Sequence, residues 1–77
     1  MTQEEARTLK VGDLVMWRDP DNGAKTIEII TENGYEPDGI FVRTTTIVVL
    51  HDPDDDYSVG DEGWMHEHNC VNLERIA

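Results

Sequence analysis

The sequence predicts an all-β fold, a small barrel or sandwich of about five short strands. Stretches rich in β-branched and aromatic residues alternate with turns made of Pro, Gly, Asn and Asp, and almost no stretch has a helical pattern. The 77 residues allow one domain. A chain this short buries only roughly 60% of the surface that it exposes when unfolded, so its core must be small.

Residues 1–8 are a polar N-terminal segment, and the folded domain is predicted over residues 9–77. Thr2 and Glu5 have the spacing of a capping box, so the segment forms either one helical turn or a frayed end. We expect no functional role for it.

Clear turn signals separate the predicted strands of the first half. A strand over residues 13–18 is followed by the loop sequence DPDNG at 19–23, in which Pro presets φ and Asn-Gly accepts positive φ. A second strand is predicted over 25–31, because β-branched residues dominate it. The dipeptide at 33–34, Asn-Gly, predicts a hairpin that ends this strand, and residues 35–39 continue as a loop.

The second half predicts three more strands. The run over residues 40–50 is longer than an ordinary strand, so it forms one bent strand or two short ones that meet near 44–46. Residues 51–62 are expected to be an exposed loop. The stretch 60–76 then has the order of a tight acidic turn, a short apolar strand entered at Trp64, a brief helical turn and a closing strand.

Apolar residues occur on both faces of the predicted strands. Ile27 and Ile29 share one face and Ile30 lies on the other, and Phe41 opposes its two apolar neighbours. Such strands are either buried on both faces or carry an outward patch that a partner covers. We expect Trp17, Ile30 and Phe41 to form a patch that contacts a protein partner.

The charge excludes several classes of partner. Seventeen acidic and six basic side chains give a net charge of −11. This field repels phosphate backbones and anionic lipids, so we expect neither direct nucleic-acid binding nor membrane binding. Two explanations of the negative net charge remain: the protein binds a basic partner, or the charge only keeps it soluble.

The most acidic window is residues 51–62, with six carboxylates and no Lys or Arg. Mutual repulsion predicts a solvated loop there, with Tyr57 and Val59 holding its middle against the domain. Asp54, Asp55 and Asp56 are candidates for setting the charge preference of a partner.

The single cysteine and the absence of a long apolar run indicate the compartment. One cysteine excludes an intramolecular disulfide and fits a reducing environment. The first ten residues lack the pattern of a secretory signal, and the longest apolar run, at 47–50, is too short to span a bilayer. We expect a soluble, cytoplasmic protein.

One set of residues could bind zinc. His66, His68 and Cys70 are spaced two residues apart, so a continuous strand would place them on one face, where His51 could complete a tetrahedral site. The spacing lacks a Cys-x-x-Cys pair, and a helical turn at this point would separate the three side chains. We therefore expect no metal and no cofactor.

Calcium binding and catalysis are also not expected. The alternate acids of residues 52–56 resemble the start of a calcium loop, but Tyr57 stands where glycine is needed and Gly63 where glutamate is needed. Cys70 with a nearby histidine lacks an orienting third group. No glycine-rich phosphate loop is present, so the sequence does not indicate an enzyme.

Two stretches resemble a known family. The segment 10–15, KVGDLV, is similar to the first strand of small SH3-like barrels from phages and bacteria. The segment 63–71, GWMHEHNCV, is similar to their closing pattern, in which glycine, an aromatic and a hydrophobic residue precede a short 3₁₀ turn and a final strand. The resemblance implies a five-stranded SH3-like barrel over 9–77 that serves as a scaffold for protein contacts.

The chain departs from eukaryotic signalling SH3 domains. It has no tyrosine-rich first loop, His66 stands where proline is usual, and the late tyrosine is replaced in the neighbourhood of Cys70. Recognition of proline-rich peptides needs an aromatic groove, so the resemblance does not imply it.

The resulting hypothesis is a non-catalytic, acidic, phage-type protein–protein interaction module. It would be a virion decoration or adaptor protein or a small accessory factor, in the host cytoplasm or the virion, and it would bind a protein partner or itself. The alternative hypothesis is a DNA mimic that inhibits a nucleic-acid-binding host protein. Its phosphate-like groups would be Asp52, Asp54, Asp55, Asp56, Asp61 and Glu62.

Overall fold

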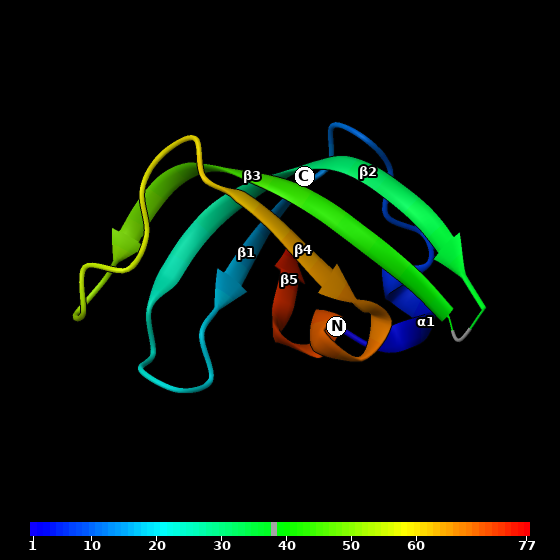
Figure 1. Cartoon of the computed structure of the whole chain (residues 1–77), viewed down its shortest axis with the longest axis horizontal. Helices are drawn as coiled ribbons and strands as arrows, with labels where there is room; N and C mark the ends of the chain where they lie inside the picture. Colours follow the sequence, from blue (N-terminus) through cyan, green and yellow to red (C-terminus); the bar gives the residue numbers. More distant parts are fainter. Residues whose placement is uncertain (38) are drawn as a thin grey trace.

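Five antiparallel strands form one sheet in the order β4-β3-β2-β1-β5 (Figure 1). The computed structural model describes residues 1–37 and 39–77. The predicted all-β class is therefore confirmed. In chain order the elements are α1 (Gln3–Ala6), β1 (Leu14–Arg18), β2 (Lys25–Glu36), β3 (Gly39–His51), β4 (Glu62–His66), the 3₁₀ helix η1 (Glu67–Asn72) and β5 (Leu73–Arg75).

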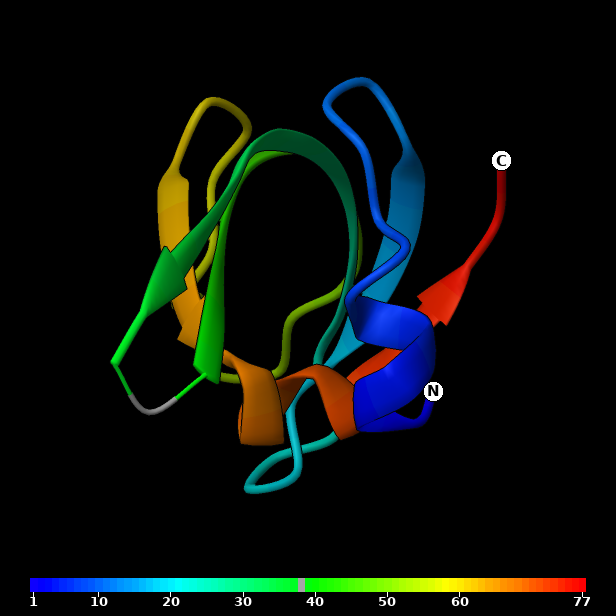
Figure 2. The same cartoon turned by 90° about the vertical axis from the view of Figure 1, so that its right-hand side faces the viewer.

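The sheet bends into an arch, and η1 and α1 lie across its open side (Figure 2). The bend follows from the long strands β2 and β3, whose pairing shifts register between Lys25 and Thr26, between Ile27 and Glu28, and between Ile30 and Glu32. Each such irregularity bends and twists a strand pair locally. Of the two alternatives for residues 40–50, the single bent strand is the one that the structure contains.

The prediction that a hairpin turn at Asn33-Gly34 ends the second strand is wrong, because both residues lie inside β2. Asn33 donates a side-chain hydrogen bond to the carbonyl of Leu9 over 2.6 Å, and Gly34 pairs with Phe41 of β3. The Phe41 ring occupies the space in which a Cβ at position 34 would stand, so glycine serves close packing here rather than a turn. The strand instead continues to Glu36, and Asp38 of the expected loop lies outside the described residues.

The hydrophobic core lies between the concave face of the sheet and η1. Its buried members come from all five strands and from both helices. Strand β1 supplies Val15, and β5 supplies Leu73. Helix α1 adds Ala6, and its N-terminus is held by the predicted capping box of Thr2 and Glu5. The other buried apolar residues of this cluster are Leu9, Ile30, Ile40, Val42, Met65 and Cys70.

The alternation of β2 places Ile30 inside, so its predicted position in a surface patch is wrong. Ile30 is 1% exposed and belongs to the core, whereas Ile27 and Ile29 are half-buried on the opposite, convex face. The register explains this choice: Leu14 pairs with Ile29, which places Val15 and Ile30 together on the concave side.

Among the residues that the structure describes, no helix is both long and apolar enough to cross a membrane.

Candidate functional site

The concave side of the arch has an apolar half and a polar half. Toward the Gly39 end of β3 the inward residues are Ile40 and Val42, which join the core beside η1. Toward the other end the buried inward residues are Thr44 and Thr46 of β3 and Thr26 and Glu28 of β2. Because the inward positions of a sheet that covers a core are normally filled by apolar side chains, this polar half is the unusual part of the described structure.

Glu28 is the centre of the polar half. The residue is 4% exposed, and its two carboxylate oxygens accept one hydroxyl each, from Thr44 Oγ1 at 2.9 Å and from Thr46 Oγ1 at 2.7 Å. Among the described residues no Lys, Arg or His forms an ion pair with it. The carboxylate is thus held in one orientation by neutral donors alone.

Aromatic residues border the same end of the arch. The indole Nε1 of Trp17 donates to the Tyr57 hydroxyl over 3.2 Å, and that hydroxyl donates to Asp19 Oδ2 over 2.6 Å. Burial and the hydrogen bond to Asp19 raise the pKa of Tyr57, and the same bond is the largest cause that lowers the pKa of Asp19. This series of hydrogen bonds fixes the rings of Trp17 and Tyr57 relative to β1.

The acidic loop, residues 52–61 between β3 and β4, is folded back onto the sheet. Its Asp52 carboxylate accepts from the backbone N–H groups of Asp56 and Tyr57, which orders the middle of the loop. Tyr57 holds the loop to the domain as predicted, whereas Val59 is 69% exposed and does not. The loop also contacts the 19–24 turn, since Asn22 donates to Asp54 over 2.9 Å.

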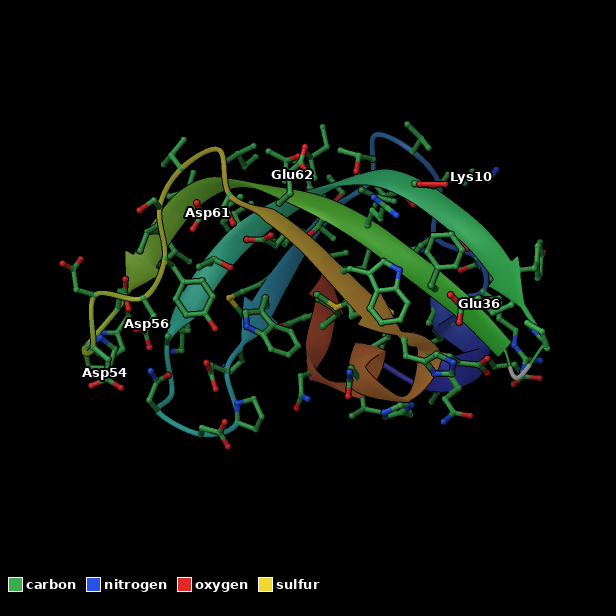
Figure 3. All side chains as sticks on the ribbon, viewed as in Figure 1. Lys10, Glu36, Asp54, Asp56, Asp61 and Glu62 are labelled. Carbon is green, nitrogen blue, oxygen red and sulfur yellow. The ribbon has the colours of Figure 1, made fainter. Side chains whose placement is uncertain are left out.

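A cavity of about 470 Å³ opens at this end, between the concave face and the acidic loop. We call it the mouth cavity. None of its described lining residues is a lysine, arginine or histidine. Figure 3 shows Asp56 and Asp61 along the loop that borders it. The lining consists of Trp17, Glu28, Thr44, Thr46, Asp56, Tyr57, Asp61, Glu62, Gly63, Trp64, Met65 and Asn69.

The mouth cavity can accept hydrogen bonds and positive charge, and it offers few donors. The two threonine hydroxyls already donate to Glu28, and the Tyr57 hydroxyl already donates to Asp19. Carboxylates accept only, and the lining side chains of the described set that can still donate by type are the Asn69 amide and the Trp64 indole N–H. A ligand that fits must therefore bring donors and positive charge.

A second hollow, of about 550 Å³, lies outside the core between α1, β1 and β5. Its charged lining residues include both signs, and Glu5, Arg18 and Arg75 are all exposed. None of its described lining residues is a buried charged group, so this hollow has less capacity to select a ligand than the mouth cavity has.

The structure does not bring the predicted partner-binding residues to one place. Trp17 and Asp56 line the mouth cavity, and Asp54 and Asp55 are exposed in the same loop outside the lining. Ile30 lies in the core, as described above. Phe41 lies toward the opposite end of β3, where its ring stacks on Trp64 with centroids 6.1 Å apart.

Sequence reasoning missed Glu28, Thr44 and Thr46. A signal was present, because a glutamate in the middle of the β-branched run 25–31 is rare unless it faces solvent or a polar interior. Placing Ile30 in an outward patch implied that Glu28, on the same face of the strand, pointed outward as well.

The proposed zinc ligands do not assemble. His66 and His68 face one another with their Nδ1 atoms 3.0 Å apart, but Cys70 is fully buried, with Sγ 3.7 Å from the carbonyl of His66. Burial raises the pKa of the Cys70 thiol to about 11. His51 lies at the far end of β3 from His66, and no group of three suitable ligands occurs among the described residues.

Comparisons of the chain with protein-family models, with curated proteins and with solved structures find no match.

Proposed function

We propose that this protein is a non-catalytic recognition module, built as an SH3-like barrel, that binds a basic segment of another protein at the mouth cavity. The observation that supports this role is the cavity itself, whose lining combines a buried carboxylate, aromatic side chains and further carboxylates, without a described basic residue. Electrostatic complementarity of this kind selects a partner and speeds encounter.

The order of elements supports the barrel. β1 pairs with both β2 and β5, and η1 connects β4 to β5, which agrees with the 3₁₀ turn before a final strand that the resemblance implies. The edge strands β4 and β5 lie at opposite sides of the sheet and are bridged by η1. An arch of this kind leaves one end free to hold a ligand.

Binding without chemistry fits the lining best. No serine, cysteine, histidine or lysine contributes to the described wall of the mouth cavity. The one cysteine of the chain is buried, with a thiol pKa of about 11, so it is a poor nucleophile. By its resemblance to phage and bacterial barrels, the module belongs with virion adaptors, decoration proteins or small accessory factors of the host cytoplasm.

The test is a random peptide library displayed on particles and panned on the full chain. Panning at about 0.3 M salt suppresses contacts between exposed charges. We expect enriched peptides to share a basic residue and to lose most of their affinity for Asp56→Lys, which places a cation at the rim of the cavity. Glu36→Lys changes the net charge equally at the other end of β2 and should keep the affinity.

Peptides that bind both charge variants with equal strength would show that the mouth cavity is not the binding site. A library that yields no enriched sequence at this salt concentration would remove the recognition role altogether.

The DNA-mimic alternative depends on the exposed carboxylates. Asp54, Asp55, Asp56 and Asp61 are all exposed and lie in one loop, whereas Glu28 and Glu67 are buried. A mimic of a duplex needs charges spread at the spacing of phosphates, so a single loop supports it less well than the mouth cavity supports recognition of a basic segment. Replacement of the loop acids by Asn should abolish inhibition of the host protein if mimicry is correct.

A further inference from the structure

We infer that the group held in the mouth cavity is the guanidinium of an arginine side chain contributed by the partner. This rests on the proposed function, since a partner protein must supply the arginine. Three features support an arginine: the geometry of Glu28, the absence of a basic partner for it among the described residues, and the aromatic side chains of the lining.

The Glu28 carboxylate is prepared for a planar fork of donors. One threonine hydroxyl reaches each oxygen, at 2.9 Å and 2.7 Å, so the carboxylate cannot rotate freely. A carboxylate has about four acceptor positions, and these two bonds use about half of them. The remaining positions, one on each oxygen, match the two parallel N–H groups of a guanidinium, whereas an ammonium is a point donor.

Glu28 also lacks a positive charge to balance it. Taking a carboxylate out of water is costly unless it is paired, and among the described residues no basic group pairs with it. Thr26 lies on the same face two residues away, and its buried hydroxyl has no hydrogen-bond partner among the described residues. A cation at the mouth cavity would supply the positive charge that the described residues do not provide to Glu28.

The aromatic residues favour a flat cation over a compact one. Trp17 and Tyr57 contribute to the lining, and their polar atoms are already engaged with each other and with Asp19. They therefore offer ring surface to the cavity instead of further hydrogen bonds. A guanidinium stacks on such surfaces and is less strongly hydrated than an ammonium, so it enters a partly buried site at lower cost.

The experiment uses small probes that differ only in the head group. Nα-acetyl-arginine amide is titrated into the ¹⁵N-labelled full chain at constant ionic strength, and the resonances of the Trp17 indole N–H and of the Thr44 and Thr46 amides are followed. The citrulline analogue has the same shape without the charge, and the lysine analogue has the charge without the fork. We expect saturable shifts with arginine, at least about fivefold weaker binding of lysine and none of citrulline.

Variants locate the contact. Glu28→Gln should weaken arginine binding by at least about tenfold, because a charged acceptor is lost. Because Glu28→Gln could also perturb the fold, Asp56→Asn at the rim of the cavity is a second test of the contact. We expect it to weaken arginine binding about two- to threefold. Asp55→Asn removes the same charge from the same loop outside the lining, and asparagine tolerates its positive φ of 56°, so it should bind as the parent does.

The outcomes separate this inference from the proposed function. If basic peptides bind at the mouth cavity but arginine and lysine probes are equivalent, or if folded Glu28→Gln binds arginine as the parent does, the arginine inference is wrong and recognition of basic segments stands. If neither peptides nor probes bind, both are wrong. Shifts that are the same for all three probes would indicate a bulk solvent effect and would also overturn the inference.

Discussion

Two buried glutamates have opposite roles because their partners differ. Glu67 is 5% exposed, and its carboxylate accepts from Arg7, with Nη2 at 2.7 Å, and from the backbone N–H of Ile40 at 3.1 Å. It thereby joins α1, η1 and the start of β3. Among the described residues, Glu28 accepts from the hydroxyl groups of Thr44 and Thr46 in its own sheet. Glu67 is therefore part of the structure, and Glu28 is available to a ligand.

Glu67 should make the protein sensitive to acid. The backbone N–H of Ile40, and then Arg7, lower the pKa of Glu67 below its ordinary value of 4.5. A lowered pKa stabilises the fold above the ordinary value, and this contribution is lost as the pH falls through the lowered one. Urea unfolding between about pH 7 and pH 2.5 should show a smaller acid-dependent loss for Glu67→Gln, within a less stable protein.

The exposed Glu74→Gln variant is the control for this measurement, and its acid dependence should follow the parent. An unchanged acid dependence in Glu67→Gln would show that Glu67 does not hold α1 and β3 in the way described.

Tyr57→Phe should weaken the hydrogen bonds at the border of the mouth cavity while keeping the aromatic ring in place. The substitution removes the hydroxyl that accepts from Trp17 and donates to Asp19. We expect the free energy of unfolding to fall by about 1–2 kcal/mol, since each such bond contributes about 1 kcal/mol. Tyr35→Phe removes a hydroxyl from a residue that is 83% exposed and should leave stability unchanged.

The measurement is urea unfolding combined with the indole N–H resonance of Trp17. That resonance should move in Tyr57→Phe and stay in place in Tyr35→Phe. A Tyr57→Phe protein with parental stability and an unmoved Trp17 resonance would contradict the hydrogen-bonded chain.

At the scale of elements, the close packing of Phe41 on Gly34 joins the far halves of β2 and β3. A methyl group at position 34 would meet the Phe41 ring, so Gly34→Ala should lower the free energy of unfolding by about 1–3 kcal/mol. In a Phe41→Ala background the same change should cost much less, which a double-mutant cycle measures. Equal costs in the two backgrounds would mean that the ring is not the obstacle.

The sequence predicted elements well where turn chemistry or a short motif decides them. The DPDNG loop at 19–23 and the order strand, 3₁₀ helix, strand after Gly63 are both present. Prediction failed at Asn33-Gly34, because the same dipeptide that favours a turn also suits a strand crossed by an aromatic ring. Tertiary packing, which the local sequence does not contain, decided between them.

The candidate site was missed for a related reason. Strand β2 has apolar residues on both faces, so hydrophobicity alone favours an inward Ile27 and Ile29. Pairing with β1 instead directs Ile30 into the core, and the period of two then carries Glu28 inside with it. Only Trp17 and the acidic loop could be recognised as candidates in advance.

At the scale of the whole molecule, the net charge of −11 acts on the folded state as a general repulsion. Salt should screen it, so raising sodium chloride from about 0.02 M to about 0.5 M should increase the free energy of unfolding by about 1 kcal/mol. The combined variant Asp54→Asn, Asp55→Asn, Asp56→Asn should be more stable at low salt and should respond less to salt. A parent protein whose urea midpoint does not rise with salt would show that the repulsion is not significant.

The polar half of the arch has a consequence for how such a molecule can change. Replacing a buried carboxylate by a hydrophobic side chain of similar size often makes a protein more stable. A variant with leucine at position 28 and valine at 44 and 46 would line this half of the arch with the side chains that a core prefers. The polar half of the arch is thus a place where stability and the proposed recognition of a basic segment favour different side chains.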